Sequence, residues 1–220
     1  RAAGSGWWYE GGGLYRHVKL VRASKLHAEQ DGLFAYSNLS WGRNGELSAL
    51  VHASVALTNE DSSPASVCVD FSLWAPHATH PSVVASAVST IDVPSGGSSS
   101  ATSSMSVPSP VLWSSAAPHL YTLNVTLSIS PCAAGKRTVI DSLSVAHGLR
   151  ELRYDADRGF FMNKEHFKVR GFCDHNTFAV VGMAVPERIS LFRAQASRAV
   201  GGNGRRTSHN PPDPAMLDIY

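Results

Sequence analysis

The stretch that decides the fold is residues 47–57, which read LSALVHASVAL. Apolar and polar or small side chains alternate along it with a period of two residues. The side chains on one face of the segment are Leu47, Ala49, Val51, Ala53, Val55 and Leu57. Strict alternation predicts a β-strand with one face buried and the other in water.

The same pattern extends outward from this strand in both directions. Three further segments alternate: 15–21, 67–73 and 120–129. Turn-forming residues cluster between such runs, at 59–64, 94–98 and 131–136. Short strands separated by regular turns predict an antiparallel β-sandwich. The serine-rich tract at 95–106 is low in complexity, and we expect it to form a mobile hairpin loop.

The periodicity changes after residue 154. Residues 167–172 predict a short strand, and Pro186 with Glu187 predicts a helix start. The helix is indicated by the spacing of Ile189, Phe192, Ala196 and Ala199, and Gly201 with Gly202 would end it. Residues 203–208 predict a second strand, and Asp213 with Pro214 predicts the start of another helix. Strand, helix, strand and helix in this order are typical of a parallel βα arrangement.

The overall charge argues against two classes of partner. The 220 residues carry a formal net charge of +2, dispersed along the chain, so we expect neither nucleic acid nor an anionic membrane as a partner. No apolar run approaches the ~20 residues of a membrane-spanning helix. The chain begins with Arg1 and has no signal-peptide pattern, so we expect an internal section of a longer protein.

Three cysteines, Cys68, Cys132 and Cys173, form an odd and sparse set without the C-x-x-C spacing of a metal site. We predict free thiols in a reducing compartment, which favours a cytoplasmic location. Two N-glycosylation triplets, at 38–40 and 124–126, would matter only in a secreted protein, so the compartment stays open.

Four motifs carry more information than the periodicity. Residues 6–18 (GWWYEGGGLYRHV) resemble the end of the sugar-binding jelly-roll domain of glycoside hydrolase family 2. Residues 110–114 (PVLWS) and 118–123 (PHLYTL) are similar to the signature of that family's immunoglobulin-like sandwich. Residues 159–176 resemble the entry into its catalytic barrel, and residues 206–212 (RTSHNPP) resemble the second barrel strand and its loop. All four occur in the family's order and together span nearly the whole chain.

This resemblance implies a layout in three parts. Residues 1–16 would be the tail of the jelly roll, residues 17–154 the sandwich, and residues 155–220 the truncated start of the barrel domain. The expected fold class is therefore an antiparallel immunoglobulin-like β-sandwich followed by the first βαβ portion of a (β/α)8 barrel. The parent would be a retaining β-galactosidase acting on a β-linked galactoside, and the resemblance leaves room for a homo-oligomer. We expect no cofactor and no metal ligand among the residues of this chain. The alternatives are a β-glucuronidase or β-mannosidase of the same family, or a non-catalytic carbohydrate-binding module.

Functional residues in such barrels gather at the carboxyl ends of the strands. The polar residues expected there, all candidates for substrate binding, are Asp174, His175, Asn176, Arg206, His209 and Asn210. The resemblance implies that His175 and His209 hydrogen-bond sugar hydroxyls. Asn176 and Asn210 could instead shape turns, Arg206 could be paired structurally at the barrel mouth, and Asp174 could be a salt-bridge partner.

The catalytic carboxylates of the family are two glutamates on later barrel strands, and a retaining enzyme holds them about 5 Å apart. The chain ends at Tyr220, before them, so we expect no catalytic residue in it and no activity from the chain alone. Its own acids in the last third are scattered over loops and helix starts: Glu151, Asp155, Asp157, Glu165, Asp174, Glu187, Asp213 and Asp218.

Two other positions need an explanation. Arg205 stands where the family usually has an apolar residue, and a charge in a barrel strand is costly unless it is paired. Either a partner lies nearby or this copy has diverged. The aromatic residues Trp7, Trp8 and Tyr9 could border the sugar site, but packing between domains is the favoured interpretation.

Overall fold

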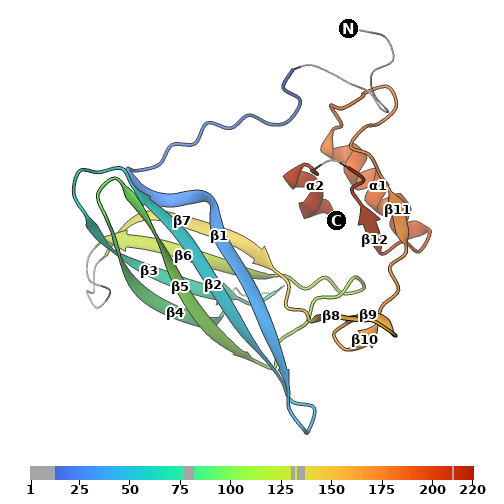
Figure 1. Cartoon of the computed structure of the whole chain (residues 1–220), viewed down its shortest axis with the longest axis horizontal. Helices are drawn as coiled ribbons and strands as arrows, with labels where there is room; N and C mark the ends of the chain where they lie inside the picture. The colour runs from blue at the N-terminus through green and yellow to red at the C-terminus, as the bar shows by residue number, and fades with distance from the viewer. Residues whose placement is uncertain (1–12, 77–81, 130–131, 133–136, 210) are drawn as a thin grey trace. The chain divides into compact units, whose positions relative to one another are not determined.

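The computed structural model describes residues 13–76, 82–129, 132, 137–209 and 211–220. The chain divides into two compact units (Figure 1). The larger unit is Arg22–His166, and the smaller one combines the described part of Arg1–Val21 with Phe167–Tyr220. The larger unit therefore reaches 12 residues beyond position 154, where the sequence pattern changes period.

The larger unit is an antiparallel β-sandwich, as the alternation predicts. Within the described residues its long strands are β1 (Leu26–Trp41), β2 (Leu47–Asn59), β3 (Ala65–Trp74), β4 (Val83–Val93), β5 (Gly97–Pro108), β6 (Tyr121–Ile129) and β7 (Thr138–His147). One sheet has the order β1-β2-β5 and the other the order β4-β3-β6-β7 (Figure 1). Every pair of neighbouring strands in both sheets is antiparallel.

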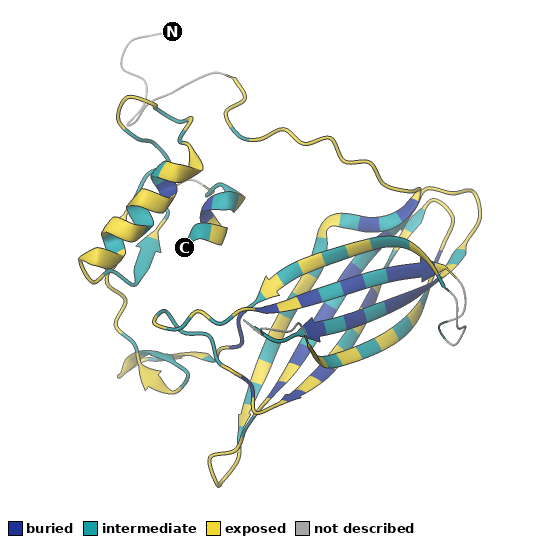
Figure 2. Cartoon of the chain, turned by 180° about the vertical axis from the view of Figure 1, so that it is seen from behind, coloured by how far each residue is buried: buried dark blue, intermediate teal, exposed yellow. Residues whose placement is uncertain are grey.

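The core of the sandwich is the set of alternating aliphatic faces. In β2 the buried apolar residues are Ala49, Val51, Ala53, Val55 and Leu57, and Leu47 at the start of the predicted face is half-buried. From the other sheet, β3 buries Val67, Val69, Phe71 and Leu73, and β6 buries Leu123, Val125 and Leu127. Figure 2 shows the resulting banding of buried and exposed residues along each strand. Each fully buried side chain of this size contributes roughly 1.5–3 kcal/mol of transfer free energy.

The serine-rich tract is a strand and not a mobile loop, so that prediction is wrong. β5 pairs with β2 along its whole length, from Asn59↔Gly97 to Ser48↔Pro108. Ala101, Met105 and Val107 are buried on one face together with the half-buried Ser103, whereas Thr102, Ser104 and Ser106 on the other face are exposed. The many serines hid a period-2 pattern that only pairing with β2 makes visible.

The alternating segment 15–21 does not form a strand, although the structure describes all of it. Leu20 is 99% exposed and Val18 76% exposed. Alternation alone does not make a strand, because a strand also needs a hydrogen-bonding partner. Conversely, the alternation of β1 is interrupted by a register shift between Ala28 and Leu33, where Asp31 has a φ of 55°. Such a β-bulge masks a strand in the sequence.

The prediction of free thiols is wrong for two of the three cysteines. Cys68 on β3 forms a disulfide with Cys132, 64 residues further on, across a Cα–Cα distance of 5.2 Å. Cys173 is free and exposed. Next to the bridge, Arg137 Nη1 lies 2.6 Å from Asp70 Oδ2. The odd number of cysteines concealed this pair. The expectation of a cytoplasmic location rested on free thiols, so it loses its support.

A small three-stranded sheet follows the sandwich: β8 (Leu152–Asp155), β9 (Gly159–Met162) and β10 (Glu165–His166). Asn163 and Lys164 form the two-residue turn between β9 and β10, and both have positive φ, 51° and 68°. Positive φ at both residues of a two-residue turn is the backbone conformation that best matches the twist of the two strands in a hairpin. Asn tolerates the left-handed conformation better than most residues.

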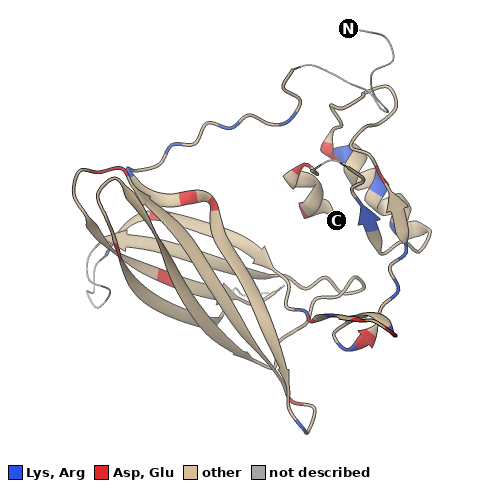
Figure 3. Cartoon of the chain, viewed as in Figure 1, with Lys and Arg blue, Asp and Glu red and all other residues tan. Residues whose placement is uncertain are grey.

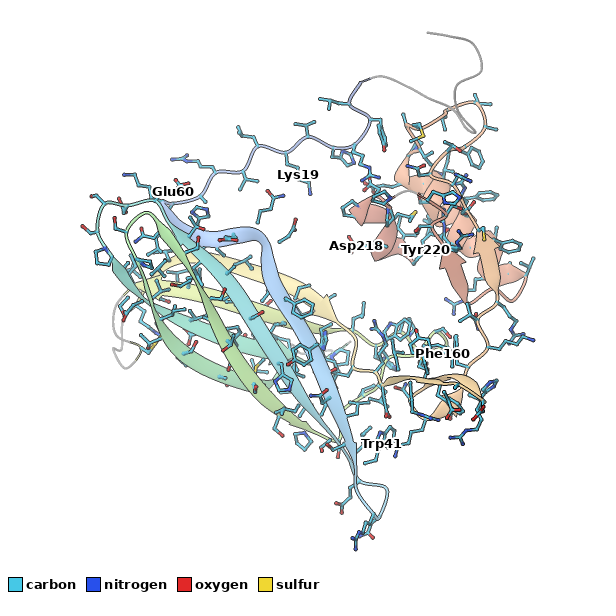
Figure 4. The ribbon with its side chains drawn as sticks, in the orientation of Figure 1. Lys19, Trp41, Glu60, Phe160, Asp218 and Tyr220 are labelled. Carbon is cyan, nitrogen blue, oxygen red and sulfur yellow. A yellow bond between two sulfur atoms is a disulfide. The ribbon has the colours of Figure 1, made fainter. Side chains whose placement is uncertain are left out.

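The PVLWS motif ties this small sheet to the sandwich. Asn163 Nδ2 donates to the carbonyl of Trp113 at 3.0 Å, and Asn163 Oδ1 accepts from the amide of Glu151 at 3.0 Å. Glu151 Oε2 also accepts from Trp41 Nε1 at 3.0 Å, at the end of β1 (Figure 4). A Cβ added at Gly148 would lie 2.9 Å from Trp113 Cγ, so the glycine allows this close packing.

The smaller unit contains β11 (Gly171–Cys173), α1 (Glu187–Ala199), β12 (Gly204–Arg206) and α2 (Pro214–Ile219). In the part of the chain that is described, no helix is long and apolar enough to span a membrane.

The strand assignment of the serine-rich tract can be tested with a matched pair of substitutions. Met105→Glu should lower the free energy of unfolding by about 3–5 kcal/mol, because it places an unpaired charge in the core. The neighbouring Ser106→Glu should change it by no more than about 0.5 kcal/mol, because that side chain points outward. Denaturant unfolding of both variants measures the difference, and equal effects would mean that the tract is a loop.

The disulfide predicts a specific peptide map. Non-reducing digestion should yield one crosslinked peptide pair containing Cys68 and Cys132, while Cys173 alone is alkylated without reduction. Cys132→Ser should lower the free energy of unfolding by about 2–4 kcal/mol, because the unfolded chain loses a crosslink. Cys173→Ser is the matched control and should unfold like the parent chain. Full alkylation of all three cysteines under native conditions would refute the bridge.

Candidate functional site

The smaller unit is built on two parallel strands joined by a helix, as the sequence predicts. β11 pairs with β12 in the register Gly171↔Gly204, Phe172↔Arg205 and Cys173↔Arg206. A Cβ added at Gly171 would lie 1.8 Å from the carbonyl oxygen of Gly204. Only glycine therefore fits at the start of β11. The strand is shifted toward the C-terminus relative to the predicted 167–172.

The helices begin and end at the predicted signals. α1 starts after Pro186, with Glu187 in its first turn, and the chain turns away at Gly201, which has a φ of 82°. At α2 the side chain of Asp213 accepts a hydrogen bond from the amide of Ala215 at 3.1 Å. These caps define where each strand and helix stops, and so where the loops after the strands begin.

The two candidate histidines lie next to each other. His175 comes two residues after β11, and His209 comes three residues after β12. Because the strands are parallel, both residues lie at the same edge of the pair, and their ring centroids are 5.8 Å apart at an angle of 51°. Ser208, with a φ of 57°, turns the chain directly before His209. Asn176 is part-buried in the first loop, and Asn210 lies outside the described residues.

Arg205, the charged residue on β12 that needed a partner, is paired. Arg205 Nη2 lies 3.0 Å from Asp174 Oδ2, and the Arg205 side chain is only 9% exposed. Its guanidinium also lies over the ring of Tyr220, 4.6 Å from the centroid (Figure 4 labels Tyr220). The amide of Asp174 donates to the carbonyl of Arg206 at 3.0 Å, which ties the two strand ends together. Arg206 Nη1 contacts Cys173 Sγ at 3.4 Å.

Sequence reasoning missed Arg193, which shapes the loop after β11. Its Nη1 donates to the carbonyl of His175 at 3.2 Å, and its Nη2 donates to the carbonyl of Thr177. The guanidinium also lies 4.9 Å from the centre of the Phe178 ring. No sequence pattern marks this residue, because its acceptors are backbone carbonyls.

Within the smaller unit, the segment before the sandwich contacts the C-terminal part of the chain. Arg16 Nη2 donates to the carbonyl of Pro211 at 2.7 Å, and Arg16 Nε lies 3.8 Å from Asp213 Oδ2. His17 Nε2 lies 3.2 Å from Glu187 Oε1. Nothing in the local sequence pairs positions 16 and 211, because the contact joins segments 195 residues apart. Trp7, Trp8 and Tyr9 lie outside the described residues.

The acids with described partners are already committed to them. Asp174 pairs with Arg205, Glu187 with His17, and Asp213 with Arg16 and the amide of Ala215. Hydrogen bonds from Arg158 and then Arg153 lower the pKa of the Asp155 carboxyl to about 2. A carboxyl with so low a pKa is ionised near neutral pH and cannot donate a proton. Over the described residues, no three His, Cys, Asp or Glu side chains come together as a metal site.

Comparison with known proteins adds the family. The model of glycosyl hydrolases family 2 matches residues 40–150. The chain is 29% identical over 212 residues to the β-galactosidase BoGH2A of Bacteroides ovatus. The alignment covers 96% of this chain and 23% of that protein. It is 26% identical to a β-glucuronidase of Formosa agariphila, over 94% of this chain and 21% of that protein.

Solved structures agree with these relatives. A family 2 member from Bacteroides cellulosilyticus superposes with a TM-score of 0.83 at 27% identity, covering 96% of this chain and 27% of that one. The β-glucuronidase 2 of Bacteroides uniformis, covalently bound to cyclophellitol-6-carboxylate aziridine, superposes with a TM-score of 0.84 at 25% identity. It covers 98% of this chain and 25% of that one. The chain thus spans about a quarter of the length of these proteins.

The ion pair at the end of β12 makes a testable contribution to stability. Arg205→Met should lower the free energy of opening of the smaller unit by about 1–3 kcal/mol, because it leaves the half-buried Asp174 carboxylate without its ion-pair partner. Hydrogen exchange of the amides in residues 167–220 measures this. Arg206→Met is the control, because that side chain is exposed, and the sandwich amides should not respond to either change. Similar exchange rates in the two variants would contradict the assigned pair.

Proposed function

Because the chain belongs to family 2 of the glycosyl hydrolases, we propose that it is a section of a retaining β-glycosidase whose parent protein hydrolyses terminal β-galactosides. The relative that supports this is the β-galactosidase of Bacteroides ovatus, which aligns along nearly the whole chain. In this proposal the chain contributes sugar-contacting residues and the parent supplies the chemistry.

The observation that carries the proposal is the pair His175 and His209. Their rings lie 5.8 Å apart at the carboxyl-terminal edge of two parallel strands. That edge is where (β/α)8 enzymes assemble their active sites. Imidazoles can both donate and accept hydrogen bonds, which suits sugar hydroxyls. Hydrogen bonds to hydroxyls that strengthen in the oxocarbenium-like transition state lower the barrier to hydrolysis.

The other candidates have weaker support. Asp174 is held by Arg205 and Arg206 contacts Cys173, so these two fit the positioning of the loop better than direct contact with the sugar. Asn176 and Asn210 stay candidates for hydroxyl binding on the strength of their place beside the histidines in sequence. Arg193 joins the set as a positioning residue, since it holds the backbone of His175.

The proposed layout follows the same reasoning. Residues 17–154 form the immunoglobulin-like sandwich, and β11, α1 and β12 form the first βαβ portion of a (β/α)8 barrel, with residues 1–16 as the tail of a jelly roll. Retaining hydrolysis needs two carboxyl groups about 5–5.5 Å apart, one as acid and one as nucleophile. The acids near the histidines are engaged in pairs, so we place both catalytic carboxylates in the remainder of the parent protein.

A second candidate is a β-glucuronidase, because relatives with that name match as much of the chain. The Formosa agariphila protein covers 94% of it, and the Bacteroides uniformis structure covers 98%. A glucuronide carries a carboxylate that a galactoside lacks, and its recognition calls for a cationic partner. A sandwich-only carbohydrate-binding module is the least favoured alternative, because such a module has no use for a parallel βαβ unit.

The proposal is tested in the parent protein with chromogenic β-galactoside and β-glucuronide substrates. We expect turnover of the galactoside, and a drop in kcat/KM of about 10²-fold in His209→Ala, the loss typical of one transition-state hydrogen-bond donor. His17→Ala is the matched control, because this histidine is exposed and pairs with Glu187. The 220-residue chain, assayed alongside, should show no turnover.

Two outcomes would overturn the proposal. Turnover of the glucuronide in place of the galactoside would move the parent to the second candidate. Turnover by the 220-residue chain that disappears in His209→Ala would show that the catalytic groups lie within it.

A further inference from the structure

A second cluster of polar and aromatic side chains lies on the outer face of the sheet β1-β2-β5. Two cross-strand rows build it. One row consists of Tyr36, His52 and Ser104, and the next consists of Phe34, Ser54 and Thr102. The six side chains line an open hollow on the sheet surface. The sheet register alone brings them together, because they come from three strands spread over 70 residues of sequence.

Aromatic rings form the floor of the hollow. The Tyr36 and His52 rings are stacked, with centroids 4.6 Å apart and an interplanar angle of 23°. The Phe34 ring lies 6.1 Å from that of Tyr36. Phe34 is 62% exposed and Tyr36 is 51% exposed, so both side chains are accessible to a ligand. Exposed neighbouring rings of this kind provide a flat apolar surface on which a ligand can stack.

Hydrogen bonds hold the imidazole in place and orient the hydroxyl beside it. Asn38 Nδ2 lies 3.2 Å from His52 Nε2, and His52 Nδ1 lies 2.9 Å from Ser104 Oγ. An amide nitrogen can only donate, so Nε2 accepts and Nδ1 carries the proton that it donates to Ser104. The Ser104 hydroxyl then has its own proton left to donate to a ligand. The exposed Thr102 adds another hydroxyl in the next row.

Two of the three strands beneath the rings carry no charge, and the two acids of β1, Glu29 and Asp31, lie in its register shift, outside the two rows. The strands Leu47–Asn59 and Gly97–Pro108 contain no Asp, Glu, Lys or Arg, and Figure 3 shows both without a charged position. The exposed large hydrophobic residues on the three strands are Phe34, Tyr36 and Leu50, all in the described part of the sheet. One aliphatic side chain among rows of hydroxyls is too little for the apolar centre of a protein interface. The chemistry fits a neutral ligand with one apolar face and many hydroxyl groups.

We propose that this hollow is a binding site for a neutral saccharide, separate from the residues that follow β11 and β12. A pyranose ring has an apolar face of C–H groups, which would stack on Tyr36 and Phe34. Its hydroxyls would meet Ser104, Thr102 and Ser54 at the rim. A few polar groups at the edge of an apolar floor are what fixes the orientation of a small ligand. The site does not depend on the proposed catalytic function, because it needs no residue of the smaller unit.

The test is saccharide binding to the 220-residue chain, with β-1,4-galactotetraose and cellotetraose as probes. We expect saturable binding at millimolar concentration or tighter, measured by calorimetry. Tyr36→Ala should weaken it about tenfold, at the upper end of what one aromatic contact contributes. Tyr36→Phe should bind like the parent chain, because it keeps the ring. Tyr154→Ala is the matched control, an exposed tyrosine of β8 that is stacked on Phe160 outside the hollow, and should have no effect.

A second measurement does not depend on any variant folding. In the unaltered chain, the probes should shift the amide resonances of residues 34–38, 52–54 and 102–104. Shifts confined to other residues, or no saturable binding of either probe, would overturn the proposal. Equal loss of binding in Tyr36→Ala and Tyr154→Ala would also overturn it. The proposal would also fail if these amides were protected in the parent protein but no saccharide protected them in the 220-residue chain. In that case another part of the parent would cover this face.

Discussion

Burial of one aliphatic face on every sandwich strand is the constraint on which the larger unit depends. Val51, Val55 and Leu57 of β2 pack toward Val69, Phe71 and Leu123 of the opposite sheet, and all six are almost completely inaccessible to solvent. Because side chains alternate along a strand, burying one face exposes the other. The serine-rich β5 pairs with β2 along its whole length but contributes only Ala101, Met105 and Val107 to the buried apolar core. The outer face is thereby left free to carry the aromatic hollow around Tyr36.

The disulfide and the hydrogen bonds around the PVLWS motif (residues 110–114) constrain the larger unit at two different places. Cys68 and Cys132 connect β3 to the segment that follows β6, and the loop between the two cysteines is long enough for a substantial entropic effect on the unfolded chain. At the other place, the carbonyl of Trp113 receives the side chain of Asn163, which also accepts from the amide of Glu151. One asparagine therefore positions the small sheet β8–β10 against residues 50 positions earlier in sequence. The motif that resembled the family signature has a local physical role.

In the smaller unit, close approach of two glycines decides the geometry. Gly171 and Gly204 let β11 and β12 pair in the register that places His175 and His209 side by side. These two histidines could be selected from sequence, because each follows a predicted strand and parallel strands end at one edge. From the sequence we could infer only that Arg205 needs a partner, because a charge in a strand is costly when unpaired. The strand pattern does not show that the partner is Asp174. Arg193 was missed for the same reason, because its acceptors are backbone carbonyls that no pattern marks.

The sequence by itself determined the alternation of β2, β3 and β6, the starts of both helices, the parallel βα order and the motifs that resemble family 2. These are local properties, set by side-chain alternation, by Asp213 and Pro186 at helix starts, and by glycines. Only the tertiary structure decided that residues 97–108 are a strand, that residues 15–21 are not, and that Cys68 bonds to Cys132. It alone assembled Phe34, Tyr36, His52 and Ser104 into one hollow. Each of these depends on which distant segment supplies hydrogen bonds or a covalent partner, and that choice is made by packing the whole chain.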